Sequence, residues 1–226
     1  MDASGARPYT VLAAPASAEI VERKSRFLCL LERADDEDAA RAAIQRARAE
    51  HRLARHCCSA FLIGQGRELR RSSDDGEPSG TAGAPMLEAL AGAAAGPDGE
   101  QDLSDVVAVV VRWFGGVLLG TGGLARAYGD AVAAALEQAR FARRSPMRIR
   151  RLEAPHAEAG RWEHELRARG FALLEPEYGA RCVGLRLAIP DEPEANRRVE
   201  AAVAELARGR ALEDVGRQWA QEPIRR

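Results

Sequence analysis

The sequence predicts an α+β protein with two domains, and two observations carry this prediction. Residues 106–111 form an unbroken run of apolar, β-favouring residues that leads through a glycine-rich segment into a helical pattern. Beyond Pro146 the predicted elements follow the order β-α-β-β-α-β, which is that of the ferredoxin-like split βαβ unit. We therefore predict a βαβ domain over residues 1–144 and a ferredoxin-like domain over residues 145–226.

The bulk composition is that of a globular protein and excludes several classes of function. Lys and Arg number 33 against 34 Asp and Glu, so the formal net charge is −1. The net charge therefore does not indicate nucleic-acid binding. The four cysteines show no CxxC spacing, no secretory leader precedes them, and no apolar run reaches about 18 residues. We expect a cytoplasmic protein with reduced thiols, no membrane partner, no metal and no cofactor.

Hydrophobic periodicity places the elements of the first domain. Residues 106–111 are typical of a central strand covered on both faces, and an apolar stripe begins at Leu124 in the helix that follows. Residues 67–82 contain almost nothing apolar and many turn formers, so we expect a surface loop there. The predicted strands are residues 9–13, 18–22, 26–32, 57–64 and 106–111, where residues 26–32 are either a separate strand or an extension of the one before. The predicted helices are residues 39–51, 83–94 and 124–141.

The second domain is predicted from the same kind of pattern. Trp162 and Leu166 stand at an i, i+4 spacing on its first helix, and Val199, Val203 and Leu206 form one stripe on its second. These stripes predict two helices that cover one face of a sheet. The predicted strands are residues 147–153, 171–177, 181–189 and 211–217, and the predicted helices are residues 157–169 and 193–208.

Two glycine-rich segments, residues 72–83 and residues 112–128, each run into a predicted helix. Glycine lets a ligand approach the backbone closely, and the free N–H groups of a helix start favour an anion. Arg112 and Arg126 add positive charge on either side of the second segment. We assign no catalytic residue. The candidate ligand-binding residues are His56, Asp74, Asp75, Glu77, Ser79, Gly80, Thr81, Gly83, Arg112, Gly115, Gly116, Gly120, Thr121, Gly122, Gly123 and Arg126.

The acidic cluster of Asp74, Asp75 and Glu77 has two interpretations. The carboxylates could hold a divalent cation or serve as general acid and base, or they could be turn formers that cap N–H groups. We favour the structural interpretation, because a metal usually needs ligands from several segments. Ser79 or Thr81 is expected to be an N-cap, and the same groups could receive a phosphate.

Several other chemistries find no support in the sequence. The second glycine segment lacks the lysine of a Walker loop and the spacing of a dinucleotide fold, and no G-x-S-x-G elbow occurs. Cys57 and Cys58 are adjacent in a predicted strand, so their side chains should point to opposite faces. Trp113 and Phe114 are either core residues or a pair that could stack on a base, and we favour the core interpretation.

The two glycine segments also carry a family resemblance. DDGEPSGTAG and FGG-x-x-LGTGGLARAY, together with residues 24–27 (KSRF) and His56, resemble the YigZ/IMPACT family. The resemblance implies a ribosomal-protein-S5-domain-2-like domain followed by a ferredoxin-like domain, similar to the fourth and fifth domains of elongation factor G. It also implies binding of nucleic acid or the ribosome, as suspected for bacterial members. The sequence departs from the family pattern at Cys57–Ser59, where Asn, Cys and an aromatic residue are usual, and at Trp113, where Tyr is commoner.

These observations support three hypotheses. The first is a non-enzymatic, translation-associated binding protein that takes RNA, the ribosome or another phosphate-bearing ligand through its glycine loops. The alternative is a small-molecule hydrolase or transferase that uses His56 and the Asp74, Asp75 and Glu77 loop. A third hypothesis, a partner-binding scaffold, requires an exposed apolar patch on the outer sheet face of the second domain.

Overall fold

The computed structural model describes residues 7–207 and 209–224, and these form two compact units. The first unit consists mainly of Pro8–Arg144, and the second mainly of Ser145–Ala220. The segment that begins at Gln221 returns to the first unit. The helices of the described residues are each too short or too polar to cross a lipid bilayer.

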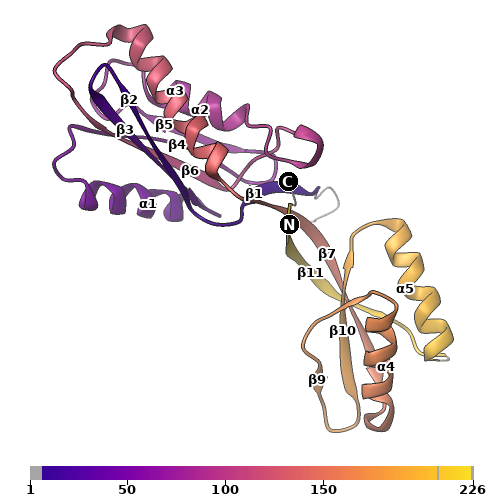
Figure 1. Ribbon diagram of the computed structural model, residues 1–226. Coiled ribbons are helices and arrows are strands. Elements are labelled where there is room, and N and C mark those ends of the chain that lie inside the picture. Colours follow the sequence, from indigo (N-terminus) through magenta and orange to yellow (C-terminus); the bar gives the residue numbers. More distant parts are fainter. Residues whose placement is uncertain (1–6, 208, 225–226) are drawn as a thin grey trace. The chain divides into compact units, whose positions relative to one another are not determined.

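The first unit is built on a five-stranded sheet with the order β2-β3-β6-β4-β5, in which every neighbouring pair is antiparallel. Helix α1 covers one face of the sheet, and helices α2 and α3 cover the other (Figure 1). The strands are β2 (Ala16–Glu22), β3 (Ser25–Arg33), β4 (His56–Ile63), β5 (Leu69–Ser73) and β6 (Val106–Trp113), and the helices are α1 (Glu37–Glu50), α2 (Gly83–Ala91) and α3 (Gly120–Gln138).

The central position of β6 explains its unbroken apolar run. Because side chains alternate along a strand, Val107, Val109 and Val111 belong to the core beneath α1, whereas Val106 and Val110 belong to the core beneath α2 and α3. All five are almost fully buried. The predicted central, doubly covered strand is confirmed, although its neighbours run antiparallel and such runs are more typical of parallel sheets.

The predicted surface loop over residues 67–82 is wrong in part. Leu69–Ser73 forms the edge strand β5, which pairs with β4. Exposed arginines on this strand kept its apolar content low, as is common for an edge strand. Further along, Glu77 and Thr81 are buried, at 9% and 6% exposure. The loop therefore enters the protein instead of lying on its surface.

The chain passes from the first unit to the second within one strand. Helix α3 ends at Gln138, and β7 (Phe141–Ala154) begins three residues later and pairs through Arg144 with β1 (Tyr9–Leu12). The predicted strand over residues 147–153 is therefore part of a longer strand. A short 3-10 helix, η1 (Pro97–Gly99), lies in the segment before β6.

The second unit has the strand order β11-β7-β10-β8, as in ferredoxin-like folds. Both helices pack on one sheet face, where Leu152, Leu185 and Leu187 contribute to the core. The predicted single strand over residues 171–177 is wrong, because it is divided around Pro176, which has no N–H to donate. The elements are α4 (His156–Ala168), β8 (Ala172–Leu173), β9 (Glu177–Tyr178), β10 (Val183–Pro190), α5 (Pro193–Leu206) and β11 (Glu213–Pro223).

The outer face of this sheet gives the scaffold hypothesis little support. Met147, Ile149 and Ala188 form an apolar cluster there, but each is buried. Beside them, Arg151 and Arg186 both form ion pairs with Glu177. The exposed apolar patch that the hypothesis requires is not formed by this cluster.

Candidate functional site

Asp74 holds the start of helix α2. Its carboxylate accepts hydrogen bonds from the backbone N–H groups of Gly80, Ala82 and Gly83 at 2.8, 3.0 and 2.8 Å. Burial acts to raise the pKa of Asp74, but these hydrogen bonds outweigh burial and leave the pKa below its usual range. The amides that were predicted to receive a phosphate are therefore taken by the chain's own carboxylate.

The hydroxyl groups of the same loop do not cap the helix. The N-cap residue of α2 is Ala82, which has no side-chain capping hydrogen bond. Thr81 donates its hydroxyl hydrogen bond to the carbonyl of Pro78 at 2.6 Å, and Ser79 is exposed. The predicted N-cap role of Ser79 or Thr81 is wrong, because Asp74 already occupies the N–H groups that an N-cap side chain would take.

Asp75 fastens the loop to strand β4. Its carboxylate accepts hydrogen bonds from the backbone N–H of Cys57 at 2.7 Å and from the guanidinium of Arg48 at 2.5 Å. Its carbonyl oxygen lies 2.9 Å from Nδ1 of His56, which must donate because a carbonyl only accepts. In the neutral ring the lone pair of His56 is therefore on Nε2.

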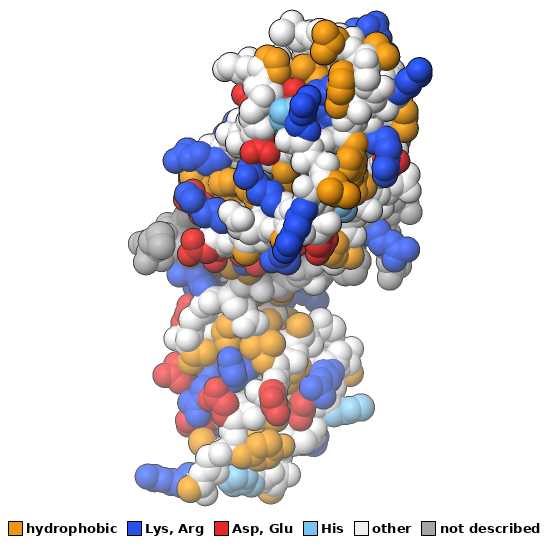
Figure 2. All heavy atoms as spheres, turned by 90° about the vertical axis from the view of Figure 1, so that its left-hand side faces the viewer, with side chains coloured by type: hydrophobic (Ala, Val, Ile, Leu, Met, Phe, Trp, Pro, Cys, Tyr) orange, Lys and Arg blue, Asp and Glu red, His pale blue; other side chains and the backbone are white. Residues whose placement is uncertain are grey.

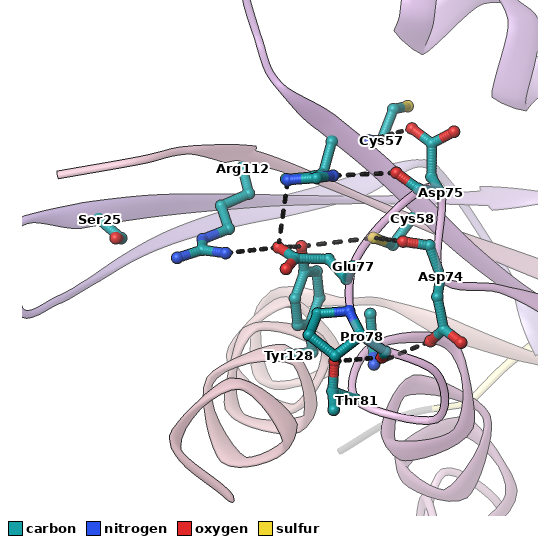
Figure 3. A network of polar contacts seen from close by, with 12 residues as sticks. Ser25, Cys57, Cys58, Asp74, Asp75, Glu77, Pro78, Thr81, Arg112 and Tyr128 are labelled. Atoms are coloured by element: carbon teal, nitrogen blue, oxygen red, sulfur yellow. Dashed lines mark hydrogen bonds and ion pairs between the residues drawn. The ribbon is translucent and has the colours of Figure 1, made fainter. Parts of the chain in front are cut away.

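Glu77 is the centre of a buried polar network (Figure 3). Its Oε1 accepts hydrogen bonds from Nη1 of Arg112 at 2.5 Å and from the hydroxyl of Tyr128 at 2.8 Å. Nε2 of His56 lies 3.9 Å from the same oxygen. The thiol of Cys58 lies 3.3 Å from the hydroxyl of Tyr128, and burial raises the pKa of this thiol to about 12. The buried carboxylate thus has the partners that its charge requires.

Arg112 is not the free cation that the sequence suggested. Its side chain is 7% exposed, and its charge is paired with Glu77. The centre of the guanidinium group lies 5.4 Å from the ring centroid of Phe27 and 5.7 Å from that of Phe114. Its Nε is buried and has no hydrogen-bond partner among the described residues. The charge of Arg112 is therefore used mainly inside the protein, where it stabilises Glu77 and contacts the surrounding rings.

The two glycine-rich segments meet in one pocket of about 380 Å³. Glu77 and Pro78 reach it from the first segment, and Arg112, Gly120 and Thr121 from the second. The remaining lining residues are Arg55, His56, Phe114, Leu118, Leu119 and Leu124. The structure thus gathers in one place a histidine, a buried ion pair, the first residues of α3 and an apolar wall.

The start of helix α3 differs from that of α2, because no described carboxylate accepts hydrogen bonds from its first N–H groups. Its N-cap residue, Leu119, has no side-chain capping hydrogen bond. Gly120 and Thr121 are exposed and line the pocket with His56, whereas Gly122 and Gly123 line a neighbouring pocket of about 390 Å³. The neighbouring pocket also contains Arg23 and Arg126. The structure therefore does not bring Arg126 together with Arg112.

Gly115 serves the architecture of the fold. A Cβ atom on this residue would lie 2.0 Å from the carbonyl carbon of Lys24, so only glycine fits. Its N–H donates a hydrogen bond to Oγ of Ser25 at 3.2 Å. Gly83 has a similar role, because a Cβ atom there would lie 2.8 Å from the backbone nitrogen of Ser73. Gly116, by contrast, is exposed, and a Cβ atom placed on it would have no neighbouring atom within 4 Å.

Several residues of the site were not predicted from the sequence. Phe114 is 42% exposed and Leu118 81% exposed, so the favoured core interpretation of Phe114 is wrong. Trp113 is partly buried and packs edge-on against His51. Tyr128, the buried partner of Glu77, lies in the helix whose apolar stripe begins at Leu124, and its hydrogen bond to Glu77 was not predicted. The position of Phe114 and Leu118 between a strand and a helix start was the available signal, since short connecting loops are exposed.

Figure 2 shows one face of the first unit, on which basic, acidic and apolar side chains are interspersed. Arg55 is exposed, and no described residue forms an ion pair with it.

Cys57 and Cys58 lie on opposite faces of β4, as predicted, since Cys57 belongs to the core beneath α1 and Cys58 to the core beneath α2 and α3.

The fold and the site define a class: two-unit α+β proteins with a doubly covered antiparallel sheet, a ferredoxin-like second unit and a pocket between two glycine-rich loops. The model of the Impact N-terminal domain matches residues 23–136, which contain both loops. The chain therefore belongs to the IMPACT family, as its motifs predicted.

Individual relatives support this assignment. The chain is 44% identical to IMPACT family member YvyE of Bacillus subtilis (strain 168) over 160 residues, which cover 71% of this chain and 70% of the relative. It is 37% identical to IMPACT family member YigZ of Escherichia coli (strain K12) over 203 residues, which cover 89% and 94%. A crystal structure of a hypothetical protein is 35% identical, with a TM-score of 0.61 and coverage of 93% of this chain and 98% of that one.

Proposed function

We propose that this chain is a cytoplasmic, non-enzymatic regulator associated with translation, and that its pocket binds RNA, the ribosome or another phosphate-bearing ligand. Membership of the IMPACT family supports the broad role. The single observation that supports the binding site is the uncapped start of α3, which lines a pocket together with Arg55 and His56.

The start of α2 provides an internal comparison. There the carboxylate of Asp74 accepts hydrogen bonds from three backbone N–H groups and satisfies the helix start. At Gly120 and Thr121 no described side chain has this role, so N–H groups of the first turn of α3 are available to an anion from solution. The exposed Arg55 adds a positive charge at the same pocket.

Binding of RNA and ribosomes with the variant Arg55→Ala tests this proposal. Filter binding and ribosome co-sedimentation at low salt should show weaker binding than the wild type, because a cation near the phosphate is lost. Arg71→Ala is the matched control, since Arg71 is an exposed arginine on β5 outside the pocket. Arg112→Ala is unsuitable because it would leave the buried Glu77 without its ion-pair partner. Equal binding by wild type, variant and control would overturn the proposal.

One observation favours a second candidate, a small-molecule hydrolase or transferase. His56 is held by the carbonyl of Asp75, and its Nε2 lies near Glu77 in the pocket. This resembles the way in which a general base is oriented. Asp74 and Asp75 are engaged in structural hydrogen bonds, so the catalytic groups of this candidate reduce to His56 and Glu77. Turnover of a phosphate ester that His56→Ala abolishes, without loss of folding, would support it.

A further inference from the structure

The wall of the pocket is apolar and exposed. Phe114 and Leu118 are 42% and 81% exposed, although both are large hydrophobic residues. Leu119 and Leu124 continue the wall and are themselves buried. Such exposed apolar side chains at the mouth of a pocket are typical of a ligand-binding surface.

Most of the apolar wall lies directly before the start of α3 in the chain. Residues 114–119 form the short connection between β6 and α3, and both ends of this connection lie in regular structure. The backbone of Gly115 is packed against Lys24. Arg112 lies close to the ring of Phe114 and is itself held by Glu77. A ligand in this pocket therefore meets the ring of Phe114 and, beside it, Gly120 and Thr121 at the start of α3.

A simple anion or a simple apolar molecule would use only part of this pocket. Inorganic phosphate could accept hydrogen bonds at Gly120 and Thr121, but it would leave Phe114 and Leu118 in water. An uncharged aromatic molecule would cover the wall and leave the helix N–H groups unpaired. The pocket volume of about 380 Å³ lies within the range for small-molecule sites and exceeds what phosphate alone needs.

We infer that the pocket takes a phosphate monoester of a planar, largely apolar group. The phosphate lies at the start of α3 beside Arg55, and the planar group packs against Phe114 and Leu118. This inference rests on the proposed anion-binding function and names the class of its ligand. A free nucleotide and the phosphorylated 5′ end of an RNA both combine a phosphate monoester with a planar base, with the ribose between the two groups.

Calorimetric titration with three small probes tests the inference. We expect phenyl phosphate to bind at least about tenfold more tightly than inorganic phosphate, because the ring buries apolar surface that phosphate alone leaves in water. Phenol should bind more weakly than phenyl phosphate, because it leaves the helix N–H groups without an anion. Equal affinity for phenyl phosphate and inorganic phosphate overturns the inference but leaves the proposed function in place. Absence of binding by both phosphates overturns both.

Variants separate the two parts of the site. Phe114→Ala should reduce phenyl phosphate affinity to near that of inorganic phosphate and leave inorganic phosphate binding unchanged. Arg55→Ala should weaken both phosphates by a similar factor. Leu53→Ala is the matched control, because Leu53 is 95% exposed and lies outside the pocket. If Phe114→Ala leaves the preference for phenyl phosphate intact, the inference is wrong.

A last comparison distinguishes the two sources of the ligand. Adenosine monophosphate is titrated beside a short oligoribonucleotide with a 5′ phosphate and the same oligoribonucleotide with a 5′ hydroxyl. Tighter binding of either phosphorylated probe than of inorganic phosphate supports the inference and identifies the source. Equal binding of the two oligoribonucleotides, with no preference for adenosine monophosphate over phosphate, contradicts it.

Discussion

Asp74 shows how a single carboxylate can take the place of a ligand. It accepts hydrogen bonds from Gly80, Ala82 and Gly83, so a loop that is rich in amides and hydroxyls presents no vacant anion site at α2. At the start of α3 no described side chain has this role, and the backbone also differs there, since Gly120 has a φ of 74°.

The variant Asp74→Asn should be less stable than the wild type at pH 7, by about 1–3 kcal/mol, because hydrogen bonds to a charged acceptor are stronger. The folded pKa of Asp74 is lowered, so its stabilisation is present above the ordinary aspartate pKa of about 3.9. This stabilisation is lost as the pH falls through the lower, folded pKa. Urea denaturation at several pH values should show the difference between variant and wild type shrinking below about pH 4.

Glu88→Ala is the control for this experiment, because Glu88 is an exposed acid on the same helix. It should change the free energy of unfolding by less than about 0.5 kcal/mol at every pH. A difference for Asp74→Asn that stays constant down to pH 2 would contradict the assignment of this carboxylate as a charged acceptor.

The buried pair of Glu77 and Arg112 leads to a second prediction at this scale. The side chains are 3% and 7% exposed, so removal of one partner leaves an uncompensated buried charge. We expect Glu77→Leu to cost about 3–5 kcal/mol of stability, and Glu77→Leu with Arg112→Met to cost less than that single change. A double-mutant cycle by urea denaturation measures the coupling. Additive losses would show that the pair is not coupled.

At the scale of elements, glycines in one motif have separate roles. Gly115 lets the end of β6 pack against the backbone of Lys24, whereas no atom would lie within 4 Å of a Cβ on Gly122 in α3. The family pattern contains both residues without distinguishing them. Only the packing of the elements shows which one the fold requires.

Alanine substitutions should separate these roles. Gly115→Ala should destabilise the protein by at least about 1–3 kcal/mol, because its methyl group would overlap the backbone of Lys24. Gly122→Ala should be neutral or slightly stabilising, because alanine favours a helix and meets no neighbour. Thermal unfolding by circular dichroism measures both. Equal shifts in the melting temperature would contradict the close approach at Gly115.

At the scale of the whole molecule, the chain forms two units with separate hydrophobic cores. Phe27 and Leu31 belong to the core of the first unit, and Leu152 and Leu185 to that of the second. The phosphate-binding proposal and the pocket concern the first unit only. We propose that the two units, residues 8–144 with the segment from Gln221 and residues 145–220, behave as separate domains. The predicted boundary at residues 144/145 is kept, but the segment that begins at Gln221 is assigned to the first unit.

A core substitution in the second unit tests this proposal. Leu185→Ala removes a side chain that is 1% exposed, and it should destabilise the second unit by about 2–5 kcal/mol. Scanning calorimetry should then show one transition at lower temperature and one close to its wild-type position. The matched variant Leu31→Ala should shift the other transition. A single transition that moves as a whole in both variants would show that the units unfold together.

Local patterns in the sequence determined most of the fold. The valine run at residues 106–111 predicted a central strand because a doubly covered strand needs apolar residues at every position. The order of elements after Pro146 predicted the ferredoxin-like unit. These predictions succeeded because periodicity and turn residues act over a few neighbouring positions. The edge strand at Leu69–Ser73 was missed because its residues are mostly polar and exposed, although it pairs with the preceding strand β4. The division around Pro176 was missed as well.

The arrangement of the residues in the site became known only from the tertiary structure. The sequence selected His56, Glu77 and Arg112 but gave no indication that one oxygen of Glu77 lies near both of the others. It also could not tell that Asp74 accepts hydrogen bonds at the start of α2, while no described side chain caps the start of α3. The first fact depends on long-range packing, which brings His56, Glu77 and Arg112 together from separate segments. The second depends on how one loop folds, because Asp74 reaches N–H groups in its own loop and at the start of the next helix. Motifs and element order are set by neighbouring residues, whereas the pairing of polar groups in a site depends on which side chains the folded chain brings to them.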